Sequence, residues 1–275
     1  MALERLIQLT RRPRFIAVQE IGNADLCSLT LGAVLAARGY VAFQRHRIDD
    51  AGAKSTHDGA ALLVRNDVSA QQWHWPEAER WSAHCESASA RVTTSDGSFI
   101  VTSLYVHGTS DDTVGFDTLL QSLRPDQLLA GDFNAQLQGS CSGVIGQHYA
   151  ARGRALERVI QEHGAMYPTP TGPTRCKRVV DAAGRKVLQL DDGTINDHIV
   201  VGSEVFSRAV SADVDAVVVP VEEWPSDHLP LAWSADIGLR GANNMKWCKR
   251  VEWHRVTPEH AAAFNAAVES FLRGV

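Results

Sequence analysis

Several residue types and patterns are scarce or absent in this 275-residue sequence, and this already excludes several classes of protein. Its five cysteines are an odd number at wide intervals, with no C-x-x-C pair, so neither a disulfide framework nor a zinc site is expected. No apolar run approaches the roughly 20 residues that a membrane helix needs. The sequence also lacks internal repeats and low-complexity segments. We therefore expect a globular protein that is neither secreted nor bound to a membrane.

The sequence also has no large excess of charge of one sign, because its 27 Lys and Arg and 32 Asp and Glu give a net charge of −5. This balance argues against a general binder of polyanions. The average conceals one basic region between Gln147 and Leu190, with Arg152, Arg154, Arg158, Arg175, Lys177, Arg178, Arg185 and Lys186. A basic face beside acidic loops fits a metal-dependent enzyme that acts on phosphates. A solvated helix and hairpin explains the same residues about as well.

Short apolar strands alternate with amphipathic helices along residues 15–235. Strands are predicted at 15–19, 40–44, 59–65, 88–94, 98–105, 127–130, 186–190, 197–201, 213–219 and 229–234, and helices at 26–37, 116–123 and 152–163. Many of the strands follow one another as hairpins, one of them across the Ser95-Asp96-Gly97 turn. This pattern favours an α/β sandwich of mixed sheets with helices outside them over a doubly wound parallel sheet.

Three short acidic motifs lie at strand ends, where α/β proteins bind ligands. Glu20 follows the first predicted strand, Asp132 lies in GDFNA, and Asp227 and His228 lie in SDHLP. Carboxylates are hard oxygen ligands that suit Mg²⁺ and not zinc. The His228 imidazole can act as a general acid or stabilise a phosphate, and Asp197 can orient it. Each signal is weak alone, because a carboxylate at a strand end is more often a turn or helix cap.

In this order, however, the motifs resemble the endonuclease/exonuclease/phosphatase superfamily of Mg²⁺-dependent phosphodiesterases. The matching segments are FIAVQE (15–20), HDGAALLVR (57–65), SLYVHG (103–108), GDFNA (131–135), INDHIVVG (195–202) and SDHLP (226–230). RGRALERVIQEHG and the later PTR look most like the endonuclease domain of non-LTR retrotransposons, which resembles apurinic endonucleases and nicks DNA to prime reverse transcription. The resemblance implies a four-layer α/β sandwich of two mixed sheets flanked by helices.

The resemblance also implies a role for each motif residue. Glu20 and Asp227 would bind Mg²⁺, or Mn²⁺ in its place, with Asp227 alternatively acting on the leaving group. Asp132 would align and deprotonate the attacking water, and Asn134 would hold that water or the phosphate.

A second set of residues would act on the phosphate and on the DNA. His228, oriented by Asp197, would stabilise the charge that develops on the phosphate. Tyr105 would donate its hydroxyl to a phosphate oxygen, although a half-buried structural tyrosine is an equal alternative. The substrate-binding residues would be Arg152, Arg154 and Arg175 in the basic region.

One departure from the superfamily concerns the first strand. Family members begin with a strand that ends in an Asn, whereas residues 1–9 here are typical of the helix that follows it. Without that strand, the sheet would have unpaired backbone groups and an open apolar slot, which costs several kcal/mol of a typical total of roughly 5–15 kcal/mol. We therefore expect an N-terminally truncated domain over residues 1–237. Residues 238–275 would be a linker and a helix that lead towards an absent reverse-transcriptase region.

Two other functions stay open beside a DNA endonuclease. An enzyme of the same fold could cleave inositol phosphates or lipid headgroups, but no apolar membrane-binding loop is evident. Alternatively, the chain is a catalytically inactive retroelement remnant that at most binds nucleic acid. The resemblance implies DNA and a reverse transcriptase of the same polyprotein as partners. It also implies a nuclear location, with a cytoplasmic one otherwise.

Overall fold

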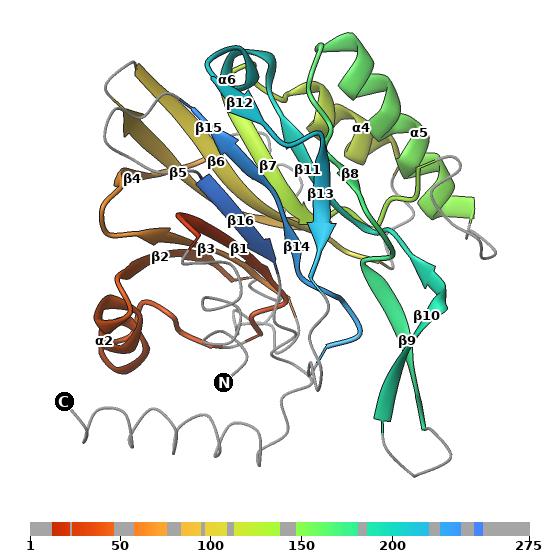
Figure 1. Cartoon of the computed structure of the whole chain (residues 1–275), viewed down its shortest axis with the longest axis horizontal. Coiled ribbons are helices and arrows are strands. Elements are labelled where there is room, and N and C mark those ends of the chain that lie inside the picture. Colours follow the sequence, from red (N-terminus) through yellow and green to blue (C-terminus); the bar gives the residue numbers. More distant parts are fainter. Residues whose placement is uncertain are drawn as a thin grey trace.

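The computed structural model describes residues 13–22, 24–46, 58–75, 84–94, 97–108, 113–137, 147–180, 186–219, 226–237 and 245–249. Two large β-sheets pack face to face, and helices lie outside them (Figure 1). The prediction of a sandwich of mixed sheets with flanking helices is confirmed. Among the helices of the described ranges, none is long and apolar enough to cross a membrane.

The first sheet has six strands in the order β12-β15-β16-β1-β3-β2. Their bounds are Ser211–Ala212 (β12), Ser234–Asp236 (β15), Met245–Lys249 (β16), Phe15–Gln19 (β1), Ala60–Arg65 (β3) and Tyr40–Arg45 (β2). β3 runs antiparallel to both β1 and β2, while β16 runs parallel to β1. β1 is buried along its whole length, as its continuous apolar run predicts for a central strand.

The second sheet has five strands in the order β11-β7-β6-β5-β4. Their bounds are Asp197–Val201 (β11), Gln127–Asp132 (β7), Gly97–Val106 (β6), Cys85–Thr94 (β5) and Ser69–Trp73 (β4). The predicted hairpin is β5–β6, which is paired without interruption from Cys85↔Val106 to Thr94↔Gly97. β6 and β7 are parallel, and β11 is antiparallel to β7, so the sheet is mixed.

Smaller elements complete the sandwich. A three-stranded sheet consists of β8 (Thr169–Pro170), β13 (Asp215–Val218) and β14 (Leu231–Ala232), and a hairpin of β9 (Arg175–Val180) and β10 (Lys186–Thr194) extends from the body (Figure 1). The helices are α2 (Leu29–Ala37), α4 (Thr113–Gln121), α5 (Gln147–Glu162) and α6 (Ser203–Ser207).

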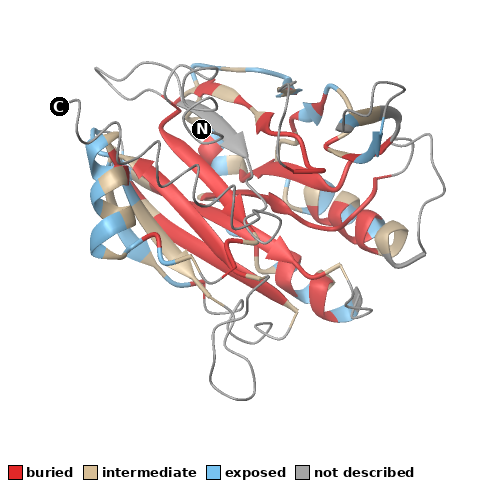
Figure 2. Ribbon diagram, turned by 90° about the horizontal axis from the view of Figure 1, so that it is seen from below, coloured by how far each residue is buried: buried red, intermediate tan, exposed pale blue. Residues whose placement is uncertain are grey.

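Three apolar clusters separate four layers. The first lies between the sheets and includes Phe15, Leu62 and Leu128. The second joins the outer face of the second sheet to α4 and α5, and the third packs α2 on the first sheet through Leu35. Figure 2 shows the buried strands between the more exposed helices. Alternate residues of each strand thus face the inter-sheet space or a helix layer.

Some predicted boundaries were wrong for local reasons. The helix predicted from residue 26 begins at Leu29, because the Ser28 hydroxyl caps it by accepting a hydrogen bond from the Leu31 N–H at 3.3 Å. The strand predicted at 229–234 is divided between β14 and β15, which pair with different partners. β4 was not predicted, because its polar sequence SAQQW lacks an apolar face.

The open slot that the sequence predicts beside β1 is filled. β16 lies between β1 and β15, in register Phe15↔Trp247 on one side and Ser234↔Lys246 on the other. A central strand buried on both faces needs a partner on each edge for its backbone groups, and β16 supplies the second one for β1. The first sheet thus includes Met245–Lys249, which lie beyond the domain boundary predicted at residue 237. The helices predicted in residues 1–9 and after Thr257 lie outside the described residues.

We expect β16 to contribute measurably to stability. A chain that ends at Lys249 should have a free energy of unfolding about 3 kcal/mol larger than one that ends at Asn244, because several inter-strand hydrogen bonds of about 1 kcal/mol each are retained. Urea denaturation followed by circular dichroism measures the difference. Equal midpoints for the two chains would show that β16 is not part of the folded sheet.

Candidate active site

A row of polar side chains crosses the second sheet at one end of its strands. The register pairs Asp197 with Asp132, Asp132 with Tyr105, and Tyr105 with Glu86. Cross-strand partners point to the same face of a sheet. Two residues away from the row, on β11, β7 and β5, lie Ile199, Ala130 and Ala88, which belong to the apolar cluster between the sheets. Because side chains alternate along a strand, the row faces the same space between the sheets. All four side chains are buried.

The GDFNA motif fixes the carboxylate of Asp132. The Asn134 backbone N–H donates to Asp132 Oδ1 at 2.9 Å, and its Nδ2 donates to Oδ2 at 3.1 Å and to the Val106 carbonyl at 2.7 Å. Asn134 adopts a φ of 44°, a left-handed conformation that a non-glycine residue rarely takes outside functional sites. Gly131 is required as well, since a Cβ there would lie 1.9 Å from the Leu104 carbonyl oxygen.

The SDHLP motif and strand β11 together orient the imidazole of His228. His228 Nδ1 lies 2.8 Å from Asp197 Oδ2, and both residues are buried. The Thr174 hydroxyl accepts a hydrogen bond from the Asp197 backbone N–H, and the Ser226 hydroxyl accepts one from the His228 N–H. A carboxylate can only accept, so Nδ1 carries the proton. Nε2 is then the nitrogen that exchanges a proton or a hydrogen bond.

Three of these residues can hold a metal ion. Asp132, Asp197 and His228 each offer a ligand atom, and these atoms lie within 4.8 Å of one another. The two carboxylates are hard oxygen ligands that suit Mg²⁺ or Mn²⁺, whereas an imidazole is a poor ligand for Mg²⁺ and His228 Nδ1 is already hydrogen-bonded to Asp197. Glu20 and Asp227, the metal ligands predicted from the sequence, are not members of this group. Glu20 is half-buried with a φ of 53°, which marks it as a second strained position.

The predicted ligand Asp227 is paired with Arg175. The Arg175 Nε donates to Asp227 Oδ2 at 3.4 Å, and Arg175 and His228 form an isolated β-bridge. Burial, with the charges of Asp227 and Asp197 added, raises the pKa of the neighbouring Cys176 to about 11. Its thiol is therefore neutral near pH 7 and does not compete with the carboxylates as a ligand.

The structure separates the predicted substrate-binding arginines. Arg154 is exposed on α5, whereas Arg152 is fully buried. Arg152 NH2 donates to the His107 carbonyl at 3.0 Å and NH1 to the Asn134 carbonyl at 3.4 Å. Its guanidinium also lies 5.9 Å from the centre of the Phe116 ring. Arg152 therefore supports the turn that carries Asn134, and its prediction as a direct substrate contact is not consistent with this burial.

Sequence reasoning missed a second carboxylate–imidazole pair at the far end of the row. His107 Nε2 lies 2.8 Å from each carboxylate oxygen of Glu86, and both residues are buried. The ring of His107 is 5.4 Å from that of Tyr105. The sequence could have revealed this pair. The β5–β6 turn sets the register Thr94↔Gly97, and counting from it places Glu86 opposite Tyr105, so that His107, two residues beyond Tyr105, lies on the same face.

Asn196 is another missed residue. Its Nδ2 donates to Asn134 Oδ1 at 3.3 Å, and Gln136 Nε2 donates to Asn196 Oδ1 at 3.1 Å. Its backbone N–H donates to the Thr174 hydroxyl. Asn196 thus links the turn after β7 to the start of β11; it lies in the INDHIVVG motif, but no role was predicted for it from the sequence.

Comparisons with known proteins assign this chain to a family. The sequence model of the Endonuclease/Exonuclease/phosphatase family matches residues 2–228. No curated protein matches the sequence. A solved endonuclease/exonuclease/phosphatase from Beutenbergia cavernae is similar in fold, with a TM-score of 0.52, 16% identity, and 85% of this chain and 71% of that chain covered.

Two further solved structures are more distant. The endonuclease domain of TRAS1, a telomere-specific non-LTR retrotransposon, matches with a TM-score of 0.48 and 14% identity over 80% of this chain and 97% of that chain. TDP2 from D. rerio, in complex with a single-strand DNA product, matches with a TM-score of 0.49 and 14% identity over 82% of this chain and 87% of that chain.

The two neighbouring arginines of α5 should differ in their effect on stability. Arg152→Ala leaves two buried carbonyls without their donor and is expected to lower the free energy of unfolding by about 3 kcal/mol. The exposed Arg154→Ala is expected to change it by less than about 0.5 kcal/mol. Urea denaturation of both variants checks this, and similar losses for the two would contradict the structural role of Arg152.

Proposed function

The chain belongs to the Endonuclease/Exonuclease/phosphatase family, whose members hydrolyse phosphodiester bonds, and on that premise we propose that it nicks DNA with the help of a divalent cation. The observation that carries the proposal is the buried group of Asp132, Asp197 and His228, held by a hydrogen-bond network at the end of the second sheet. Burying two carboxylates and an imidazole so close together is costly unless a cation or a reacting phosphate makes use of them.

The donors of the site divide between a cation and the reacting groups. Asp132 would hold the cation, with Glu20 from the end of β1 as a second ligand, while Asp197 orients His228. A bound divalent ion supplies charge neutralisation at the scissile phosphate. Asp132, whose oxygens are fixed by Asn134, aligns the attacking water and takes its proton.

His228 acts on the phosphate itself. With Nδ1 committed to Asp197, Nε2 is the ring nitrogen left to contact a phosphate oxygen, and it donates to that oxygen when the ring carries a second proton. Asp227, held by Arg175, is the carboxylate proposed to act on the leaving group. Tyr105 lies beside Asp132 in the row, and its hydroxyl is proposed to donate to the same phosphate.

The β9–β10 hairpin supports a polymeric substrate. β9 begins at Arg175, which bridges to His228, and its exposed Lys177 and Arg178 follow on the projecting hairpin (Figure 1). Arg178 NH2 donates to the Ser226 carbonyl at 3.2 Å, which ties the hairpin to the SDHLP loop. Spaced cations that run outward from a catalytic site suit a backbone with many phosphates better than a single phosphate ester.

The motifs quoted from the sequence favour target-site cleavage of the retrotransposon type. On that basis, we propose DNA as the partner, with a reverse transcriptase of the same polyprotein acting after the nick. An enzyme that hydrolyses inositol phosphates would use the same catalytic residues and would differ only in the surface that contacts the substrate.

Nicking of supercoiled plasmid tests the proposed activity. The protein with Mg²⁺ should convert supercoiled to open-circular DNA, and EDTA should abolish the conversion. Asp132→Asn should lower kcat by about 10³-fold, since both the cation and the attacking water lose their carboxylate. Arg65→Gln, which changes a charge at the opposite end of β3, is the matched control and should retain activity.

Other outcomes point to the alternative functions. Hydrolysis of inositol phosphates without any nicking would replace DNA as the substrate class. Absence of both activities in a protein with cooperative unfolding would favour an inactive remnant.

The Asp197–His228 pair should behave as one catalytic unit. Asp197→Asn is expected to lower kcat about 10- to 100-fold, because the imidazole loses its charged partner. His228→Gln should lower it further, and the double variant should be no slower than His228→Gln alone. Single-turnover nicking rates measure all three. Additive losses would mean that the two side chains act independently.

A further inference from the structure

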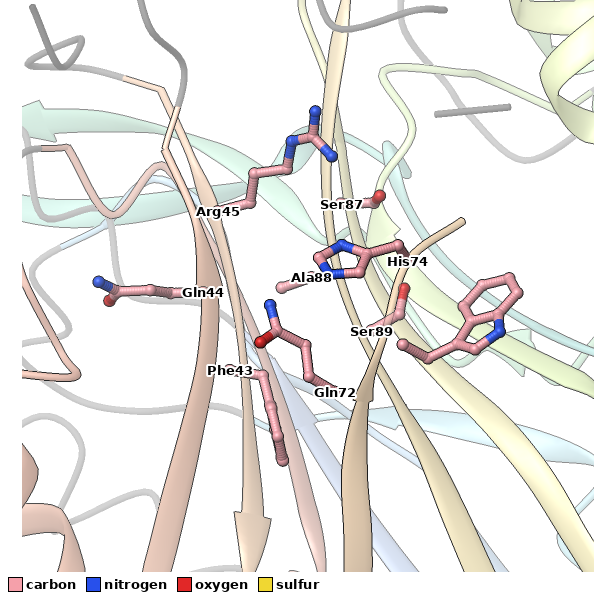
Figure 3. Close-up of a pocket in the computed structure, with 9 residues that line it drawn as sticks. Phe43, Gln44, Arg45, Gln72, His74, Ser87, Ala88 and Ser89 are labelled. Carbon is pink, nitrogen blue, oxygen red and sulfur yellow. The ribbon is translucent and has the colours of Figure 1, made fainter. Parts of the chain in front are cut away.

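A pocket of about 250 Å³ lies between the two sheets, outside the catalytic row. β2 contributes Phe43 and Arg45, and β4 with the residue after it contributes Gln72 and His74. The residues Ser87, Ala88 and Ser89 of β5 complete the wall. Figure 3 shows side chains from the facing strands extending into the same space, while Gln44 points the other way.

Strand register places this pocket at the same end of the sandwich as the catalytic row. In the first sheet, Gln19, Ala60 and Arg45 lie in one cross-strand line, and Glu20 directly follows Gln19. Arg45 is therefore two strands from β1, a distance of about 10 Å at roughly 4.8 Å per strand.

The second sheet gives the same result. Glu86, the last residue of the catalytic row, is two residues from Ala88 in the pocket wall. The two positions face the same side of β5, because side chains alternate along a strand. The Gln19 Nε2 donates to the Ser103 hydroxyl at 2.8 Å, which joins the two sheets between the row and the interior.

The chemistry of the pocket suits an anion. Among the described residues that line it, the ionisable ones are Arg45 and His74, and no carboxylate is present. The Gln72 amide adds a neutral donor, whereas the side chains of Ser87 and Ser89 alternate with Ala88 and face the other side of β5. The Gln44 amide is committed elsewhere, since it accepts from the Leu26 N–H and donates to Asp25.

From this placement, we propose that the pocket seats one backbone phosphate of the DNA strand, within a few nucleotides of the cleaved bond. Arg45 is the main contact, with His74 and Gln72 as further donors. The two phosphates would be close together because β2 lies about 10 Å from β1. The inference rests on the proposed function, because it requires a polynucleotide in the site.

The salt dependence of DNA binding tests this contact. In the Asp132→Asn background, which binds without cleaving, anisotropy of a fluorescein-labelled duplex gives the affinity between 50 and 200 mM KCl. Arg45→Gln should weaken binding about fivefold at 100 mM KCl and reduce the slope of log K against log [salt] by about 0.9. Arg45→Lys keeps the charge and should restore the slope.

Arg91→Gln is the matched control, because Arg91 lies on β5 towards its other end and pairs with Asp126. It should leave both affinity and slope unchanged. An Arg45→Gln slope equal to that of the parent, or an equal change in Arg91→Gln, overturns the subsite while the proposed function stands. No duplex binding by the parent protein overturns both. Thermal unfolding of each variant confirms that the comparison is between folded proteins.

Discussion

The hydrogen-bond register across β11, β7, β6 and β5 is the constraint on which the site depends. It sets Asp197, Asp132, Tyr105 and Glu86 in one line on one face. A slip of one residue in any pair would turn that side chain into the helix layer, because strand side chains alternate with period two. Gly131 helps to fix the register of β6 and β7, because no larger residue fits against the Leu104 carbonyl.

Holding the row in place requires buried and strained groups that contribute little to stability by themselves. Carboxylate–imidazole pairs lie at both ends, Asp197 with His228 and Glu86 with His107. Removing charges from water is unfavourable, so each pair needs close partners to be tolerated. Arg152 donates hydrogen bonds to the carbonyls of His107 and Asn134 and so supports the turn that carries Asn134. The left-handed conformation of Asn134 persists because these contacts over-determine it.

The first sheet contributes to the site by anchoring the end of β1 opposite this row. β1 holds Gln19 against Ser103 and presents Glu20 directly after it. That strand is central only because β16, more than 220 residues later in the chain, pairs with its second edge. The geometry at Glu20 is thus coupled to a segment that belongs to no catalytic motif, and a change in β16 can reach the site through β1.

Local signals in the sequence determined much of this protein. The Ser95-Asp96-Gly97 turn and the apolar runs predicted the β5–β6 hairpin and the central strands. Such signals act over a few residues, through turn geometry and side-chain alternation. That Asp132, Asn134, Asp197 and His228 belong to one site was implied instead by the family resemblance that GDFNA and SDHLP carry. The tertiary structure alone decided that Arg152 is internal, that β16 completes the first sheet and that Arg45 faces His74 across a pocket. These three depend on contacts between segments far apart in the chain, and such contacts leave no local pattern in a single sequence.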